Sequence, residues 1–201
     1  MNGAVWALEW RQAARRRRVI ALSAGVPLAL VLLVGLGGAP APHAALVYSV
    51  LFTFFGTFGA AIPWARDSER GLIHRLELAG LGMPTIAGQR LVASALLDLL
   101  ELVPSLLAIA LVYHVGAADA ARLFALVGVG LLTANALGML VAAVAGSLAE
   151  TALLAAVSAL LLLHAGGVFR TPAPGGALDA LQRAVPFHYM HQAILAALGA
   201  N

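Results

Sequence analysis

Two acidic residues, Asp98 and Glu101, lie three positions apart inside a largely apolar stretch that runs from Leu91 to Tyr113. Residues at this spacing share one face of a helix, so the two carboxyl groups are expected to lie side by side. If the stretch crosses a membrane, each carboxyl group costs about 2.5–3.5 kcal/mol on insertion scales. Two explanations remain open: the acids bind a cationic group or line a polar pathway, or they hydrogen-bond to neighbouring helices.

A second pair, His188 and His191, is also three positions apart, with Tyr189 between them. Such a pair is able to bind a metal ion or haem. No third ligand lies nearby in the sequence, however, and this favours aromatic packing at a membrane surface. We therefore predict no metal site and no cofactor.

Residues for covalent or hydrolytic catalysis are missing from the sequence. It has no Cys, no Gly-x-Ser-x-Gly motif and no His-Glu-x-x-His motif. A phosphate-binding P-loop requires a Lys, and the sequence has none. We predict that the chain is not an enzyme, that it has no catalytic residue, and that any ATP hydrolysis takes place on another polypeptide.

The composition excludes an ordinary water-soluble domain. Hydrophobic residues make up 62% of the 201 residues and charged residues only 10%, whereas about 25% of the residues of a soluble domain are charged. The 12 basic residues are all Arg, and the net charge is only +3. So small an excess in so apolar a chain indicates orientation in a membrane and no binding to nucleic acid.

Five apolar stretches are long enough to cross a bilayer as helices, which takes about 20 residues each. We therefore predict an all-α integral membrane protein that forms a single domain over residues 1–201. The stretches are Val19 to Gly37, Ala44 to Ala65, Leu91 to Tyr113, Leu123 to Gly146 and Thr151 to Phe169.

The positions of the Arg residues predict the orientation, because the cytoplasmic side of a membrane protein carries the excess of positive charge. Nine of the 12 Arg precede the first stretch or lie between the second and third. The prediction is a multi-pass protein of the cell (inner) membrane with a cytoplasmic N-terminus. The segment from Val5 to Arg11, with Trp6 and Trp10 four apart, is typical of a helix in the inner membrane interface that contacts lipid. An equally good interpretation is that the segment and the Arg residues after it are only a basic stop for the first span.

The longest internal polar segment runs from Arg66 to Pro84. Leu72, Leu76 and Ala79 recur in it at helical spacing, and charged residues surround them. This pattern predicts a short amphipathic helix on the membrane surface, ended by the Gly and Pro residues that follow. Either the helix simply rests on the bilayer, or its charged face docks a cytosolic partner.

In the fourth apolar stretch, Ala134, Gly138, Ala142 and Gly146 recur at four-residue spacing. A stripe of small residues lets another helix approach closely, so we predict that it is a packing surface. Asn135 lies beside the stripe and is a candidate for the polar pathway, although the sequence favours a polar contact between helices.

The loop pattern resembles the permease subunits of ABC-2 type transporters. In that family an acidic and Arg-containing patch is followed by a Gly, a short Leu-rich helix, a Gly/Pro break, and a Gly with a basic residue that opens the third span. The matching residues here are Asp67, Glu69, Arg70, Gly71, Arg75-Leu76, Gly82-Met83-Pro84 and Gly88-Gln89-Arg90-Leu91. The departures are Gln89, where a Lys is common, and His74-Arg75, where an acidic residue often lies.

This resemblance implies the membrane subunit of an exporter for a hydrophobic or amphipathic compound, such as a drug, a lipid or a haem-like molecule. It further implies a separate ATPase subunit and a second permease copy, identical or paralogous. The docking residues that it implies are Asp67, Glu69, Arg70, Gly71, Arg75 and Leu76. The candidates for the substrate pathway are Asp98, Glu101 and Asn135. The alternative function is an ion-coupled carrier, in which the two acids bind protons, or a membrane scaffold without transport.

The segment from Val185 to Ile194 also resembles the family's Pro-aromatic segment before its last span. Members usually have six spans, and too few residues follow Ile194 for a sixth. We expect the sixth span to be absent and the C-terminal segment to be external and amphipathic. The other interpretation is that Ala177 to Leu198 forms a membrane-associated hairpin around Pro186.

Overall fold

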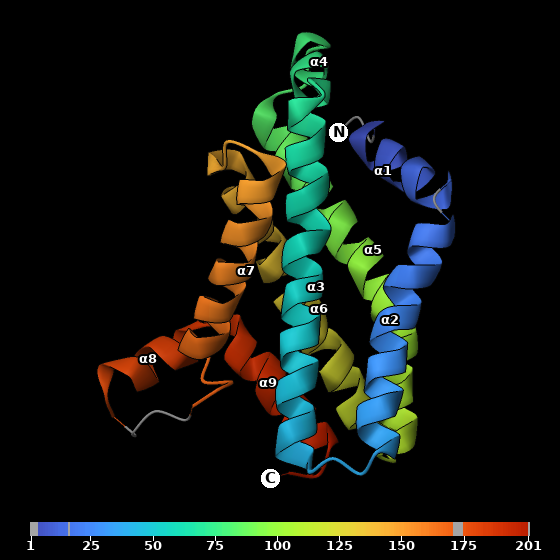
Figure 1. The fold of residues 1–201 in the computed structure, drawn as a ribbon, viewed down its shortest axis with the longest axis vertical. Helices are drawn as coiled ribbons and strands as arrows, with labels where there is room; N and C mark the ends of the chain where they lie inside the picture. Colours follow the sequence, from blue (N-terminus) through green and yellow to red (C-terminus); the bar gives the residue numbers. More distant parts are fainter. Residues whose placement is uncertain (1–3, 16, 171–174, 201) are drawn as a thin grey trace.

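The computed structural model describes residues 4–15, 17–170 and 175–200 of the chain. Every regular element in this part is a helix (Figure 1), which confirms the prediction of an all-α protein. The helices are α1 (Ala4–Arg15), α2 (Arg17–Leu36), α3 (Ala41–Glu69), α4 (Leu72–Leu78), α5 (Met83–Val112), α6 (Ala117–Val144), α7 (Leu148–Ala165), α8 (Ala177–Ala184) and α9 (Pro186–Ala197).

Five of the described helices are long and apolar enough to span a membrane, namely α2, α3, α5, α6 and α7. Their central parts coincide with the five predicted stretches. α3 and α5 are longer than predicted, with 29 and 30 residues. At 1.5 Å per residue each is about 45 Å long, which exceeds the roughly 30 Å of a bilayer's hydrocarbon core. Both therefore extend beyond the apolar stretch toward the loop that joins them.

α3 lies at the centre of the bundle and packs most closely against α6. Glycines make this approach possible: a Cβ added at Gly138 would collide with the Thr57 carbonyl oxygen, and one at Gly56 would lie 2.9 Å from the Ala134 side chain. The predicted packing stripe is thereby confirmed for Ala134, Gly138 and Ala142, which are buried. Gly146 lies in the exposed turn beyond the end of α6.

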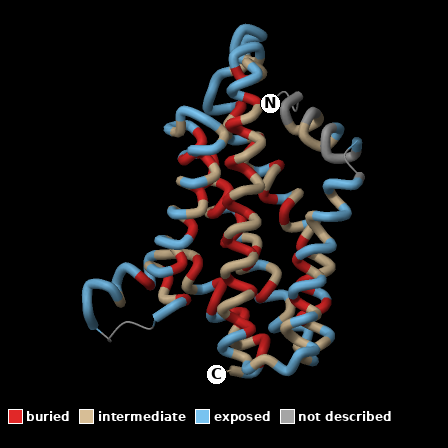
Figure 2. Tube along the Cα trace, in the orientation of Figure 1, coloured by how far each residue is buried: buried red, intermediate tan, exposed pale blue. Residues whose placement is uncertain are grey.

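The C-terminal segment differs from the sequence-based expectation. Helices α8 and α9 are separated by a break at Val185, which precedes Pro186. Residues of α9 such as Phe187, Met190 and Ile194 are completely buried and belong to the main core with residues of α3 and α6. α9 is able to pack closely against α6 here because Met190 fills the space where Gly130 of α6 lacks a side chain. α9 is therefore part of the core, and only α8 is external to the bundle (Figures 1 and 2).

α8 is amphipathic, as predicted for this segment. Leu178 and Leu181, three residues apart, are exposed on it, while Arg183 donates to the Asp179 carboxylate one turn earlier at 2.8 Å. The Gly175 N–H donates to the same carboxylate at 3.0 Å. This backbone hydrogen bond, with the Arg183 contacts, holds the pKa of Asp179 below its usual range.

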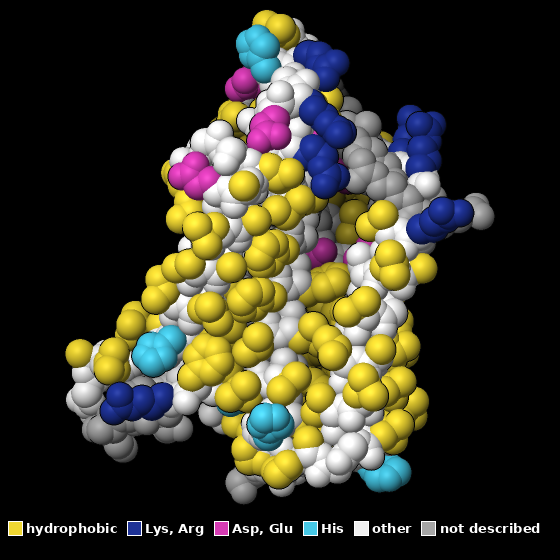
Figure 3. Space-filling model, in the orientation of Figure 1, with side chains coloured by type: hydrophobic (Ala, Val, Ile, Leu, Met, Phe, Trp, Pro, Cys, Tyr) yellow, Lys and Arg dark blue, Asp and Glu magenta, His cyan; other side chains and the backbone are white. Residues whose placement is uncertain are grey.

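Helices α1 and α4 lie at one end of the bundle, and the C-terminus lies at the other (Figure 1). We call the first the arginine-rich end, since most Arg side chains of the described residues gather there (Figure 3). The helix predicted over Val5 to Arg11 forms as part of α1, in which the Trp6 and Trp10 rings lie 6.0 Å apart. Arg16, one of the Arg residues that precede the first apolar stretch, lies outside the described residues.

Candidate functional site

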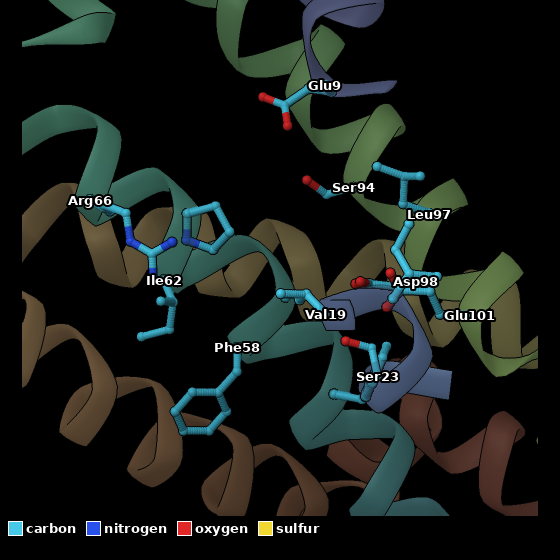
Figure 4. Close-up of a pocket in the computed structure, with 14 residues that line it drawn as sticks. Glu9, Val19, Ser23, Phe58, Ile62, Arg66, Ser94, Leu97, Asp98 and Glu101 are labelled. Atoms are coloured by element: carbon cyan, nitrogen blue, oxygen red, sulfur yellow. The ribbon is translucent and has the colours of Figure 1, made fainter. Parts of the chain in front are cut away.

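A cavity of about 400 Å³ lies between α2, α3 and α5, on the side of the bundle that α1 adjoins (Figure 4). Its polar lining consists of Glu9, Ser23, Arg66, Ser94, Asp98 and Glu101. Its apolar lining includes Val19, Ile20, Phe55, Phe58, Ile62 and Leu97. Acidic side-chain atoms are visible inside a hollow between α3 and α2 on the face that Figure 3 shows. The two predicted acidic residues therefore face one cavity.

Asp98 is 6% exposed and is wedged between α3 and α6. The Asn135 side-chain amide donates to Oδ2 of Asp98 at 2.7 Å and to the Leu131 carbonyl at 2.9 Å. On the α3 side, a Cβ at Gly59 would lie 2.6 Å from both carboxylate oxygens, so only glycine permits this approach. Asn135 does not line the cavity; it holds Asp98 from the side of α6.

Glu101 lies one helical turn beyond Asp98 and is half-buried. The Ser23 side chain of α2 lines the same cavity, and Figure 4 shows Ser23 and Glu101 on the same side of it. The ion pairs among the described residues involve other carboxylates. Neither Asp98 nor Glu101 is paired with an Arg or His side chain in this part of the chain.

A cluster of charges joins three helices just above the cavity, where α5 begins. Arg90 is 4% exposed, and its Nε donates to Oε1 of Glu9 on α1 at 2.7 Å. Its Nη2 donates to Oδ2 of Asp67 at the end of α3, and the guanidinium lies 5.6 Å from the centre of the Trp64 ring. This Arg90 cluster links α1 to both helices that flank α4. Glu9 also lines the cavity, so the two features share a residue.

The Arg90 cluster is the part of the site that sequence reasoning missed. From the sequence, Arg90 is expected to contribute to the orientation and to match the family's basic residue at the start of the third span, and Asp67 is expected to dock a partner. In the structure Asp67 is 9% exposed, and its carboxylate is turned inward to Arg90. The sequence does place an acidic residue, Asp67, and a basic residue, Arg90, on the two sides of the loop that joins the second and third spans. Since α3 ends and α5 begins at the same end of the bundle, this placement could have predicted their contact.

The other five predicted docking residues lie at or beside α4. Gly71 adopts a φ of +67°, a conformation that favours glycine and turns the chain from α3 into α4. Glu69 accepts a hydrogen bond from the Leu148 N–H at 2.9 Å, which ties this loop to the start of α7. The Arg75 guanidinium donates to the Arg70 and Gly71 carbonyl oxygens.

The exposed surface of α4 and its approach combines charges with one large apolar side chain. Arg70, Arg75 and Glu77 are exposed, and Leu78 is 74% exposed at the end of the helix. Leu76 is half-buried and packs against the second core cluster beneath. The helix is therefore anchored on one side and presents a mixed surface on the other.

The two histidines of α9 have separate partners. His191 is buried, and its Nδ1 lies 2.8 Å from the Ser49 hydroxyl of α3. His188 lies at 2.7 Å from the Gln182 amide and packs edge-on against Tyr189. In the described part of the chain no group of three or more His, Asp or Glu is placed to hold a metal ion.

Comparison with known proteins identifies one family. The family described as ABC-2 type transporter matches residues 2–198 of the chain. Neither curated proteins nor solved structures gave a match.

Proposed function

Since the chain belongs to the ABC-2 type transporter family and is thus the permease component of an ABC transporter, we propose that it exports hydrophobic or amphipathic compounds. A permease of this kind generally works with an ATPase subunit and as a dimer. The energy would come from a separate ATP-binding cassette subunit. A second permease copy, identical or paralogous, would complete the translocation pathway.

The observation that carries this proposal is α4, which protrudes at the arginine-rich end between α3 and α5 (Figure 1). Leu78 is 74% exposed there, at the tip of a loop rich in charge. An exposed large apolar residue with a rim of charges is typical of a protein-binding surface. We assign this surface, formed by Arg70, Arg75, Glu77 and Leu78, to the ATPase subunit.

The same assignment sets the orientation. ATP is cytoplasmic, so the ATPase and α4 must lie on the cytoplasmic side of the inner membrane. The excess of Arg at this end of the bundle independently favours the cytoplasm. The N-terminal helix α1 would then lie in the inner interface, in contact with lipid headgroups.

Co-purification tests the docking surface. Tagged permease is purified in mild detergent from cells that also produce its ATPase, which is identified by its P-loop sequence. We expect Leu78→Glu, and separately Arg70→Glu, to reduce the recovered ATPase by about tenfold or more, because a buried unpaired charge weakens an interface by more than 1.4 kcal/mol. Leu78 and Arg70 are exposed, so both variants should insert normally.

Arg122→Glu is the matched control, since Arg122 is also exposed but lies at the start of α6, at the opposite end of the bundle. It should retain the ATPase in full. Undiminished recovery with both α4 variants would refute this docking surface. Purification of the wild type without any ATPase would refute the exporter assignment itself.

A further inference from the structure

The cavity between α2, α3 and α5 opens toward the side of the bundle, which is the lipid-facing direction for helices that span a membrane (Figure 3). α2 forms one wall and is itself poorly covered: Val19, Leu22 and Val26 are each more than half exposed. A compound dissolved in the adjoining lipid leaflet would therefore reach the cavity without passing through water.

The residues that α3 and α5 contribute to the cavity differ in chemistry. Phe55, Phe58 and Ile62 of α3 contribute apolar and aromatic surface. Asp98 and Glu101 of α5 contribute two carboxyl groups without a cationic partner among the described residues. A carboxylate removed from water is costly unless a proton or a cation neutralises it. Aromatic faces also attract cations.

Asp98 supplies a separate indication of a ligand. It is more than nine-tenths buried, and Asn135 occupies only its Oδ2 atom. No donor among the described residues reaches Oδ1, although the residue lines the cavity. Oδ1 is not among the fully enclosed polar atoms that lack a partner, so this oxygen is open to the cavity and is available to a group from outside the chain.

We propose that this cavity binds a lipophilic cation, meaning a compound with an apolar body and a positive charge, which enters sideways from the leaflet at the arginine-rich end. This inference rests on the proposed export function and names the substrate class. The apolar body lies against Phe55 and Phe58, and the positive charge lies beside Asp98 and Glu101. The volume of about 400 Å³ suits a small organic molecule and not a bare metal ion.

Glu9 connects this site to the rest of the transporter. It lines the cavity and is also held by Arg90, which binds Asp67 at the start of the α4 loop. A cation in the cavity attracts Glu9 and so competes with Arg90 for it. A cation bound in the cavity therefore affects the contact that Arg90 makes between α5 and α3, the two helices that flank the docking surface.

The test uses the full chain in phosphatidylcholine nanodiscs and radiolabelled tetraphenylphosphonium as the probe. Its permanent charge cannot be lost to a base, so binding reports on charge and not on proton transfer. We expect saturable binding that tetraphenylmethane, which has the same shape but no charge, does not displace. Asp98→Asn and Glu101→Gln should each weaken it by about tenfold or more, since each removes a charge contact in a poorly hydrated site.

Asp119→Asn is the matched control, because Asp119 is an exposed acid at the opposite end of the bundle. It should bind the probe like the wild type. Unchanged affinity in the double variant Asp98→Asn/Glu101→Gln would overturn the proposal. Displacement by tetraphenylmethane in the wild type would overturn it without any variant, as would the absence of saturable binding.

ATPase co-purification is measured on the same variants and keeps the two hypotheses apart. Absence of saturable probe binding by the wild type, with the ATPase still bound, refutes the cation site and leaves the exporter assignment intact. Weakened probe binding by the acid variants, with the ATPase still bound, supports the cation site. Probe binding by a chain that never recovers an ATPase supports the site and refutes the exporter assignment.

Discussion

At the scale of single residues, the cavity depends on a side chain that does not line it. Asn135 is completely buried and supplies the only hydrogen bond to Asp98 found among the described residues. Asn135→Ala leaves the carboxyl group without a donor, and we expect it to lower the free energy of unfolding by about 1–3 kcal/mol. The apparent unfolding temperature in detergent measures this loss.

Asp98→Asn is the informative comparison, because its amide oxygen still accepts from Asn135 while the charge is removed. It should unfold at or near the temperature of the wild type. An Asn135→Ala variant as stable as the wild type would show that Asp98 finds another donor and does not depend on Asn135.

Replacing Arg90 should also change the structure away from position 90. Arg90→Met leaves Glu9 and Asp67 without their shared partner, and breaking a buried pair in this way typically costs about 3–5 kcal/mol. α1 should then detach from α5, and hydrogen exchange of the α1 amides should become faster. Arg90→Lys should be intermediate, since a single ammonium replaces the planar guanidinium fork.

Arg11→Met provides the control for Arg90 within α1, because Arg11 is exposed. In Arg11→Met, the α1 amides should stay as protected from hydrogen exchange as those of the wild type. Equal protection in Arg90→Met would mean that lipid contacts, and not the ion pairs, hold α1 in place.

At the scale of helices, the closest contact is that between α3 and α6 at Gly138. A methyl group there would overlap the Thr57 carbonyl oxygen, which belongs to the backbone and cannot move aside. We expect Gly138→Ala to destabilise the protein by about 1–3 kcal/mol through overpacking. Gly25→Ala in α2 meets no atom within 4 Å, so it should be neutral or stabilising by up to about 1 kcal/mol. Thermal unfolding of the pair compares the two effects directly.

The sequence alone predicts where the helices form, but it does not predict which residues of different helices contact one another. Apolar stretches predict spans because length and hydropathy are local properties, and the stripe at Ala134 and Gly138 predicted close packing correctly. The pairing of Asn135 with Asp98, and of Arg90 with Glu9, joins residues far apart in the chain, which no local pattern encodes. α9 was misjudged for the same reason: its burial depends on the space at Gly130 of α6.

At the scale of the whole molecule, the proposed orientation is open to a direct test. The chain has no Cys, so single cysteines can be labelled without background. The test introduces single cysteines at exposed positions. Two variants, Ser68→Cys and Glu77→Cys, lie at the arginine-rich end, and two others, Asp119→Cys and Ala180→Cys, lie on elements at the opposite end of the bundle. A membrane-impermeant thiol reagent should label the second pair in intact cells and reach the first pair only after permeabilisation. Labelling of Ser68→Cys in intact cells would show that the orientation is the reverse of the proposed one.

The length of α3 has a mechanical consequence. If α3 tilts as a rigid rod, the tight contact of Thr57 with Gly138 serves as its fulcrum. One arm reaches from Thr57 to Glu69 beside α4, about 18 Å, and the other reaches from Thr57 to Ala41, about 24 Å. A push on α4 then swings the distant end of α3 through a slightly larger arc in the opposite direction. Gly59 lies two residues from the fulcrum, so the cavity wall would stay nearly still while the far end of the bundle opens.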